Sequence, residues 1–335
     1  MSPALDDIAY RAKDQPHACF TALAHHLTME FLDDTWQQLN QHGAPGLSGE
    51  TMDAYDRVRR TRIPTLVETL KAHAYRVPPI RRVYIPKAGQ PQKRRPLGIP
   101  EVEDRLLQAA VNRLLQPIYE ADFVEGSYGF RPGRSPHDAL GALQTTMMTR
   151  PMQWVFEADI RGFFDHLQRE WLMTMLRERI GDPGILRLIA KWLHAPIVEP
   201  DGHRSRPTEG APQGGPLSPM LGNVYLHYAL DLWLRRPCGP SVGGKRNSSA
   251  LRMTLWWCSS TRRTPAVSRR RCRGGWPSSD SSSRRRKLGW CPSAGTRGAS
   301  PNSKASYLHA LTFWASRISV RAAGLDTGCF NGGRP

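Results

Sequence analysis

Hydrophobic positions recur at helical spacing over most of the first 235 residues. The clearest case is 101–119, where apolar residues stand at positions 102, 106, 107, 110, 111, 114, 115 and 118. This spacing places them along one side of a helix, so the segment predicts a helix that faces a core. The same period predicts further helices over 25–41, 51–74, 135–146, 168–180, 184–194 and 217–234, with Ser135 as an N-cap of the third.

Short stretches of β-forming residues interrupt these helices. Val83–Ile85, the basic segment AGQPQKRR and then PLGIP predict a hairpin with a basic turn. WVFEADI, residues 154–160, predicts a strand, and 195–210 predicts a hairpin that turns at Asp201-Gly202. Helices with few strands indicate a helix-rich α/β (α+β) fold.

The pattern ends near residue 236. Residues 1–235 hold 28 Lys and Arg against 27 Asp and Glu, whereas 236–335 hold 19 against 2. Five of the six cysteines and five of the ten tryptophans also lie after 236, and no helix or strand period is found there. We expect a disordered or non-native tail without a packed core, which supplies no strand beside 154–160. A Ser/Arg-rich nucleic-acid-binding tail is the alternative, although such tails are poor in Trp.

Other features narrow the class of protein. No apolar run reaches the ~18–20 residues of a membrane span, and the N-terminus lacks a secretion signal. The cysteines form no CxxC pair, which gives no indication of a zinc site or a disulfide framework. We expect a cytoplasmic protein that does not associate with a membrane.

Three segments have residues suited to metal or ligand binding, and each also has a purely structural explanation. Asp159 ends the strand 154–160 and suits a divalent metal, although an Asp at such a turn is more often a cap. The loop 211–219, APQGGPLSP, allows close backbone approach to a ligand or is an ordinary Gly/Pro loop. The basic hairpin suits a triphosphate or a nucleic-acid backbone, or is a solvated turn.

The order of these segments resembles a known family. YIPKAGQPQKRRPLGIP, VEDRLLQAAVNRLLQPIYE, SYGFRPGRSPHDAL, FEADIRGFFDHL and EGAPQGGPLSPMLGNVYLHYALD follow one another from 84 to 231. Together they resemble the reverse transcriptase domain of group II intron-encoded proteins, from roughly Gly49 to Trp233. The resemblance implies a right-hand polymerase fold, with fingers over 49–150 and a partial palm over 151–235. By periodicity and composition, a helical segment over 1–48 precedes them and the tail over 236–335 follows. The resemblance also implies RNA-directed DNA synthesis from a primer.

The resemblance assigns roles to matching positions. Asp159 and the Ile160 carbonyl would hold Mg²⁺ in a two-metal site, near Gln213 across one cleft. Phe164 would exclude a ribonucleotide 2′-OH, and Gln213 with Gly214 would contact the dNTP. The residues that would hold its triphosphate are Lys87, Lys93, Arg94 and Arg95. Those that would contact template RNA are Tyr128, Phe130, Arg131 and Arg134, with core packing the alternative for the two aromatic residues. RNA template, DNA primer and intron RNA are the implied partners.

One part of the family pattern is missing. The family carries its second metal carboxylates on a Tyr/Phe-Ala-Asp-Asp hairpin, whereas the only acids after Asp231 here are Asp280 and Asp326. Reading the codons of Leu251–Ser259 from their third base allows Ala-Asp-Asp-Phe-Val-Val-Val-Phe, with the second Asp and two Val forced by Met and Trp codons. The same shift over Thr312–Ser316 forces Leu-Gly and allows Phe-Leu-Gly-Phe, which the family carries downstream. We therefore expect the tail to be an out-of-frame translation.

This reading places the frame change between Leu234 and Ala250 and predicts a chain without polymerase activity. Two alternatives stay open: a non-catalytic remnant that binds intron RNA, and a reverse transcriptase of another bacterial retroelement.

Overall fold

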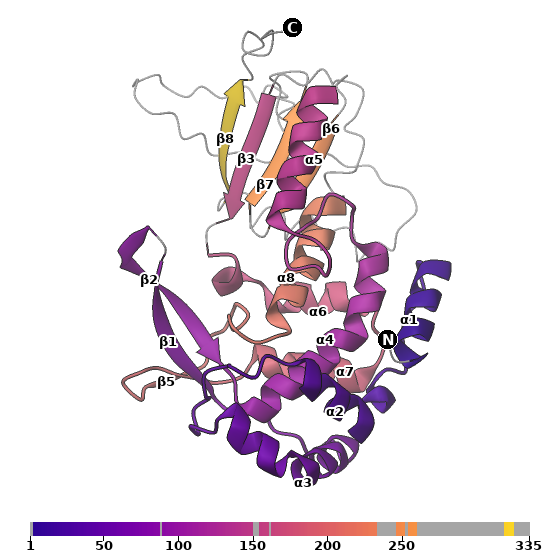
Figure 1. The fold of residues 1–335 in the computed structure, drawn as a ribbon, viewed down its shortest axis with the longest axis vertical. Coiled ribbons are helices and arrows are strands. Elements are labelled where there is room, and N and C mark those ends of the chain that lie inside the picture. The colour runs from indigo at the N-terminus through magenta and orange to yellow at the C-terminus, as the bar shows by residue number, and fades with distance from the viewer. Residues whose placement is uncertain are drawn as a thin grey trace, which may run out of the picture. The chain divides into compact units, whose positions relative to one another are not determined.

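The chain forms two compact units, each discontinuous in sequence. The computed structural model describes residues 3–87, 89–149, 154–160 and 162–232, and the backbone of three later strands (Figure 1). One unit comprises Met1–Phe123 and Phe163–Tyr225, and the other comprises Val124–Gly162 and Leu226–Pro335. We call them the helical unit and the sheet unit.

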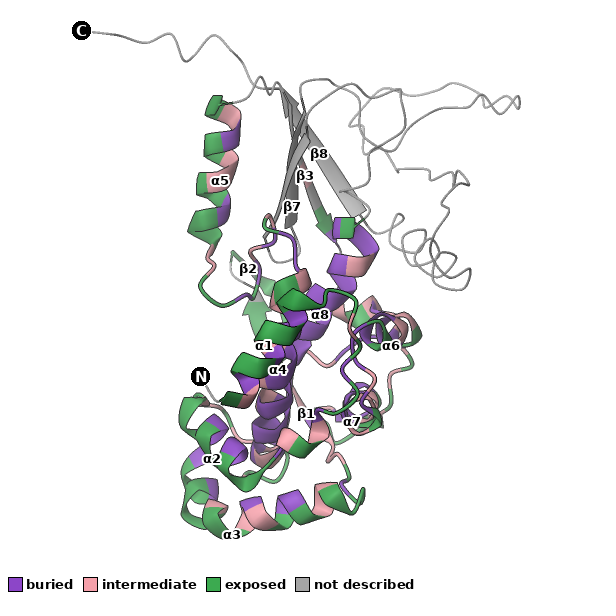
Figure 2. Cartoon of the chain, turned by 90° about the vertical axis from the view of Figure 1, so that its right-hand side faces the viewer, coloured by how far each residue is buried: buried purple, intermediate pink, exposed green. Residues whose placement is uncertain are grey.

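The helical unit is built around α4 (Val102–Asp122), which is buried along nearly its whole length (Figure 2). Its contacts include α1 (Pro3–Asp14), α2 (Met29–Gln38) and α3 (Met52–Lys71). The predicted apolar positions of α4 are all buried, because a helix at the centre of a domain has no face left for water. Two further helices, α6 (Arg169–Arg177) and α7 (Pro183–Leu193), pack on each other.

A small sheet lies in the same unit, in the order β2-β1-β4-β5. β1 (Ile80–Lys87) and β2 (Gln90–Ile99) form the predicted hairpin, and β4 (Ile197–Val198) with β5 (Arg204–Ser205) forms the second one. One expectation was wrong: the basic residues 93–95 lie within β2 and not in the turn, because the pairing continues as far as Lys87 and Gln90. The parallel pairing of β1 with β4, more than a hundred residues apart, left no sign in the sequence pattern.

The sheet unit contains α5 (Pro136–Thr149) and a second sheet in the order β6-β7-β3-β8. β3 (Trp154–Ile160) has the predicted bounds, and Ser135 caps α5 by accepting from the Asp138 N–H at 3.2 Å. α8 (Ser218–Leu226) ends at the border of the units and continues as a π-helix over His227–Asp231.

Three strands of the tail join this sheet. β6 (Arg246–Leu251), β7 (Thr254–Ser259) and β8 (Ile318–Gly324) are described by their backbone, and β7 and β8 pair with β3 on either side. The expectation that the tail supplies no strand beside β3 was therefore wrong, since a strand with two open edges takes up backbone partners whatever side chains they carry. The predicted absence of a packed tail core lies outside the described residues. None of the described helices is long and apolar enough to cross a membrane.

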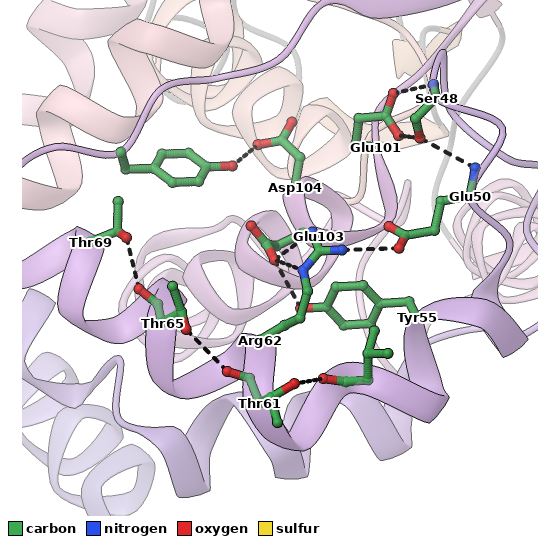
Figure 3. A network of polar contacts seen from close by, with 12 residues as sticks. Ser48, Glu50, Tyr55, Thr61, Arg62, Thr65, Thr69, Glu101, Glu103 and Asp104 are labelled. Carbon is green, nitrogen blue, oxygen red and sulfur yellow. Dashed lines mark hydrogen bonds and ion pairs between the residues drawn. The ribbon is translucent and has the colours of Figure 1, made fainter.

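Polar contacts join α3 to α4 (Figure 3). Arg62 of α3 bridges Glu50 at 3.0 Å and Glu103 at 2.9 Å, and Glu103 also accepts from the Tyr55 hydroxyl. Desolvation raises the pKa of Tyr55, and the Glu103 charge adds to the effect. The hydroxyl therefore stays a proton donor to this carboxylate.

Asp104, the next residue on α4, is a carboxylate at the centre of the core. It is 1% exposed and accepts hydrogen bonds from the Tyr75 hydroxyl at 2.7 Å, Trp192 Nε1 at 2.6 Å and Gln108 Nε2 at 3.0 Å. Burial raises its pKa to about 6, and the three donors oppose this by favouring the charged form. Ionisation of Asp104 therefore lowers the stability of the folded state.

This cost predicts a pH dependence of folding. Below the unfolded pKa of about 3.9 the carboxyl is protonated in both states and the penalty is absent. The penalty grows as the pH rises through about 4 to 6, and two pKa units correspond to roughly 3 kcal/mol. Relative to Asp104→Asn, the wild-type chain should lose that much free energy of unfolding between pH 4 and pH 7 in urea titrations. A difference in free energy of unfolding between the wild-type chain and Asp104→Asn that does not change with pH would contradict the account.

Candidate functional site

The loop 211–215 lies directly against strand β2 in the helical unit. The backbone N–H of Gly98 donates to the Gln213 carbonyl at 2.5 Å. Gly214 has a φ of +120°, and a Cβ placed on it would lie 2.3 Å from the Gly98 carbonyl oxygen. Only glycine permits both this backbone conformation and this approach. The PLGIP and PQGG segments, far apart in sequence, therefore form one contact.

The same loop contacts the segment that follows β3. Gln213 Nε2 donates to Asp165 Oδ1 at 3.1 Å, and the Ala211 N–H donates to the Phe164 carbonyl at 2.8 Å. The ring of Phe164 packs beside α8, with a carbon 3.1 Å from where a Cβ on Gly222 would stand. The helical unit thus contains all three of Phe164, Gln213 and Gly214, which the sequence predicted to lie beside the dNTP.

Charged groups secure the beginning of the loop. Arg169 donates from Nε to the Gly210 carbonyl at 2.8 Å and from a terminal nitrogen to the Glu209 carbonyl at 3.0 Å. His166 Nδ1 lies 2.9 Å from Glu209 Oε1. Desolvation lowers the pKa of Arg169, partly opposed by the Glu209 charge. A guanidinium remains charged in proteins, so these bonds hold the loop at neutral pH.

The hairpin offers positive charge from the same unit. Lys93, Arg94 and Arg95 are exposed on β2, and none forms an ion pair with another described residue. The side chain of Lys87 lies outside the described residues. Exposed cations without a carboxylate partner suit the binding of phosphate groups.

Asp159 belongs to the sheet unit and is exposed near the end of β3, and the next residue, Ile160, is buried. In the backbone register Asp159 lies opposite Thr254 of β7 and Ser319 of β8. Since Asp159 and Gln213 lie in different units, their expected proximity stays a prediction.

The segment 124–134 of the sheet unit carries the four residues predicted to contact template RNA. Phe130 is 48% exposed with a φ of +56°, a conformation that few non-glycine residues adopt. Tyr128 is half-buried, with the Arg134 guanidinium 5.3 Å from its ring centre. Arg131 is buried and donates to the Val124 and Ser127 carbonyls, each at 2.8 Å. Arg131 holds this loop together, and template contact by the four residues stays a prediction.

Comparison with known proteins shows that most of these segments match a single protein family. Residues 85–249 match the family model described as "Reverse transcriptase (RNA-dependent DNA polymerase)". Group II intron-encoded protein LtrA of Lactococcus lactis subsp. cremoris is 34% identical over 224 residues, which cover 67% of this chain and 37% of LtrA. The chain therefore contains a reverse transcriptase domain related to those of group II intron-encoded proteins.

Other similar proteins include protein YkfC of Escherichia coli (strain K12), 37% identical over 195 residues, which cover 56% of this chain and 50% of YkfC. A chain of the solved "Partial Cas6-RT-Cas1--Cas2 complex" is 24% identical with a TM-score of 0.44, covering 71% of this chain and 38% of that one. The chain spans half or less of the length of LtrA and YkfC.

Reverse transcriptases generally use divalent metal ions, but the described residues of this domain do not complete a two-metal site. No three His, Cys, Asp or Glu side chains among them lie together as a metal cluster would require. Glu157 shares a face of β3 with Asp159 by the two-residue period of a strand. The residues paired with Asp159 in the backbone register are Thr254 and Ser319, neither of which is an acidic residue.

Sequence reasoning missed several residues of the reverse transcriptase domain. Asp165 was noted only as part of FFD, yet it accepts from Gln213. Gln108 lies beneath the loop, with its amide oxygen 2.2 Å from where a Cβ on Gly215 would stand. A polar residue four positions after Asp104 on a helix predicted to face the core was the available signal for Gln108.

The contact between Gly214 and β2 predicts a specific sensitivity. Gly214→Ala should destabilise the chain by about 2–4 kcal/mol, because the new Cβ meets backbone and the φ is unfavourable. Urea unfolding measures this loss.

Gly202→Ala is the matched control. Gly202 has a φ of +85° but nothing within 4 Å of its Cβ position, so only the conformational cost of about 1 kcal/mol should appear. Equal losses in the two variants would show that the close approach to β2 adds nothing.

Proposed function

We propose that the chain is the fingers and partial palm of a group II intron-type RNA-directed DNA polymerase, and that it does not extend primers. Residues 49–150 would form the fingers and 151–235 the partial palm, after an N-terminal helical segment over 1–48. A frame change between Leu234 and Ala250 would replace the rest of the palm by the tail over 236–335. The observation that carries this proposal is the backbone register beside Asp159.

That register supports a lost carboxylate hairpin. β6 ends at Leu251 and β7 begins at Thr254, which pairs with Asp159. The shifted reading places its two Asp in the codons that span Arg252 to Thr254. A pair of carboxylates there would stand next to Asp159 in the sheet. The family match ends at residue 249, within the interval proposed for the frame change.

The helical unit would retain the substrate contacts. Gln213 and Gly214 would contact the dNTP, and Phe164 beside α8 would restrict the space at its 2′ position. The cations predicted to hold the triphosphate are Lys87, Lys93, Arg94 and Arg95. Those predicted to contact template RNA are Tyr128, Phe130, Arg131 and Arg134. RNA template, DNA primer and intron RNA would be the partners.

Two-metal nucleotidyl transfer requires ligands around both ions, since the pair stabilises the attacking and the leaving oxygens. Asp159 alone cannot provide them. We therefore expect no Mg²⁺-dependent primer extension on an RNA template by the 335-residue chain. Restoring the reading frame between Leu234 and Ala250 should produce extension, and adding Asp159→Asn to the repaired protein should abolish it.

Extension by the unrepaired chain that Asp159→Asn removes would overturn the proposal. Another acid would then complete the site. A repaired protein that stays inactive would equally count against the hidden carboxylate pair.

The exposed cations of the hairpin favour RNA binding even if the chain synthesises no DNA. Such binding without DNA synthesis is what the alternative, a non-catalytic remnant, would do. Single-stranded nucleic acid releases about 0.7 counterions per neutralised phosphate, which sets the slope of log affinity against log salt. Replacing Lys93, Arg94 and Arg95 together by Gln should make that slope shallower by about 2 if each contacts one phosphate. A salt titration of binding to single-stranded RNA measures the change.

The control replaces three exposed arginines outside the hairpin, Arg57, Arg60 and Arg76, by Gln. It removes the same charge and should leave the slope nearly unchanged. Equal effects of both sets would mean that net charge, and not the hairpin, determines binding.

A further inference from the structure

Gln108 of α4 lies directly beneath the PQGG loop. Its side chain is buried, and its amide oxygen and nitrogen lie 2.2 Å and 3.5 Å from where a Cβ on Gly215 would stand. The oxygen end of the amide therefore faces the glycine. Any side chain at 215 would displace it.

Asp104 determines which end of that amide faces the loop. Gln108 Nε2 donates to Asp104 Oδ2 at 3.0 Å, while Asp104 Oδ1 accepts from Tyr75 at 2.7 Å and Trp192 at 2.6 Å. An ionised carboxylate only accepts hydrogen bonds. Gln108 must therefore turn its NH₂ group toward Asp104 and its oxygen toward Gly215.

The orientation matters because the loop comes so close. An amide oxygen tolerates contact with a Cα–H group, whereas an NH₂ group there brings two hydrogens against it and loses its acceptor. Displacement of Gly215 would also move Gln213, two residues earlier, whose carbonyl accepts from Gly98.

We propose that Asp104 is a positioning residue that acts through Gln108: it keeps the amide oxygen toward Gly215 and so holds the Pro212–Gly215 loop against β2. The relevance of this to nucleotide binding rests on the proposed function. The arrangement of the loop itself does not, because all the residues involved belong to the helical unit.

The test exchanges the carboxylate and the amide between positions 104 and 108. In Asp104→Asn the remaining side-chain oxygen accepts from Tyr75 and Trp192, but the new NH₂ group faces the NH₂ group of Gln108. The Gln108 amide therefore turns around, and its oxygen points away from Gly215. In Asp104→Asn with Gln108→Glu, the Glu carboxylate accepts from the Asn and again presents an oxygen to Gly215. This double variant keeps the shape and the net charge of the wild type.

The measurement is hydrogen exchange at the Gly98 amide at pH 8, relative to the Phe20 amide, which donates to the Arg179 carbonyl in the same unit. Asp104→Asn should raise the Gly98 ratio about 10-fold or more, and the double variant should return it to within about 3-fold of wild type. Tyr75→Phe removes a hydrogen-bond donor to Asp104 without turning the Gln108 amide around. It should lower the melting temperature and leave the ratio unchanged.

The proposal is overturned if the double variant exchanges as fast as Asp104→Asn, or if Tyr75→Phe raises the ratio equally. Either result would reduce Asp104 to a contributor to general stability. No nucleotide, primer or metal is present in this experiment. Its outcome is therefore separate from the success or failure of primer extension.

Discussion

The close approach of two backbones, at Gly98 and at Gln213 and Gly214, is the constraint on which the candidate nucleotide site depends. It joins the base of the basic hairpin to the loop that precedes α8. Its cost is that position 214 tolerates no side chain, that a side chain at 215 would displace the Gln108 amide, and that buried polar groups of α4 must support the loop from below. Asp104, destabilising for the fold when ionised, is explained by this support.

The two units divide the features of a polymerase between them. The helical unit contains the hairpin cations, Phe164 and the loop with Gln213, which donates to Asp165 beside Phe164. The sheet unit contains Asp159 on β3, with strands from the tail on both sides. What the described part of that sheet lacks is carboxylates beside Asp159, not backbone pairing. Under the proposed function, the helical unit would retain the contacts to the dNTP while the metal site stays incomplete, which is what an out-of-frame tail would produce.

Much of this fold was predictable from local patterns. Helical periodicity identified α4 and α7, and the bounds of β3 were predicted to the residue. Asp201-Gly202 marked the turn between β4 and β5. The motifs PLGIP and PQGG indicated the family. Their contact through Gly98 was not predictable from spacing, because it depends on how distant segments pack.

Other features escaped prediction for similar physical reasons. The burial of Asp104 depends on Tyr75 and Trp192, which belong to other elements. Pairing of β7 with β3 was missed because the tail has no strand-like alternation, whereas strand pairing uses backbone groups that every residue except proline provides. Composition marked a change near residue 236, whereas the sheet unit joins residues on both sides of that point, and composition could not show where the tail backbone would pair.

The central claim concerns the coding sequence of the tail, and the nucleotide sequence of the gene tests it most directly. Translation in all three forward frames should show Ala-Asp-Asp across the codons of Leu251 to Thr254, within a shifted frame whose charge is balanced as in residues 1–235. If that frame contains no Asp-Asp codons there, the hidden hairpin does not exist. The tail would then be a genuine basic extension, and the chain would be an RNA-binding remnant.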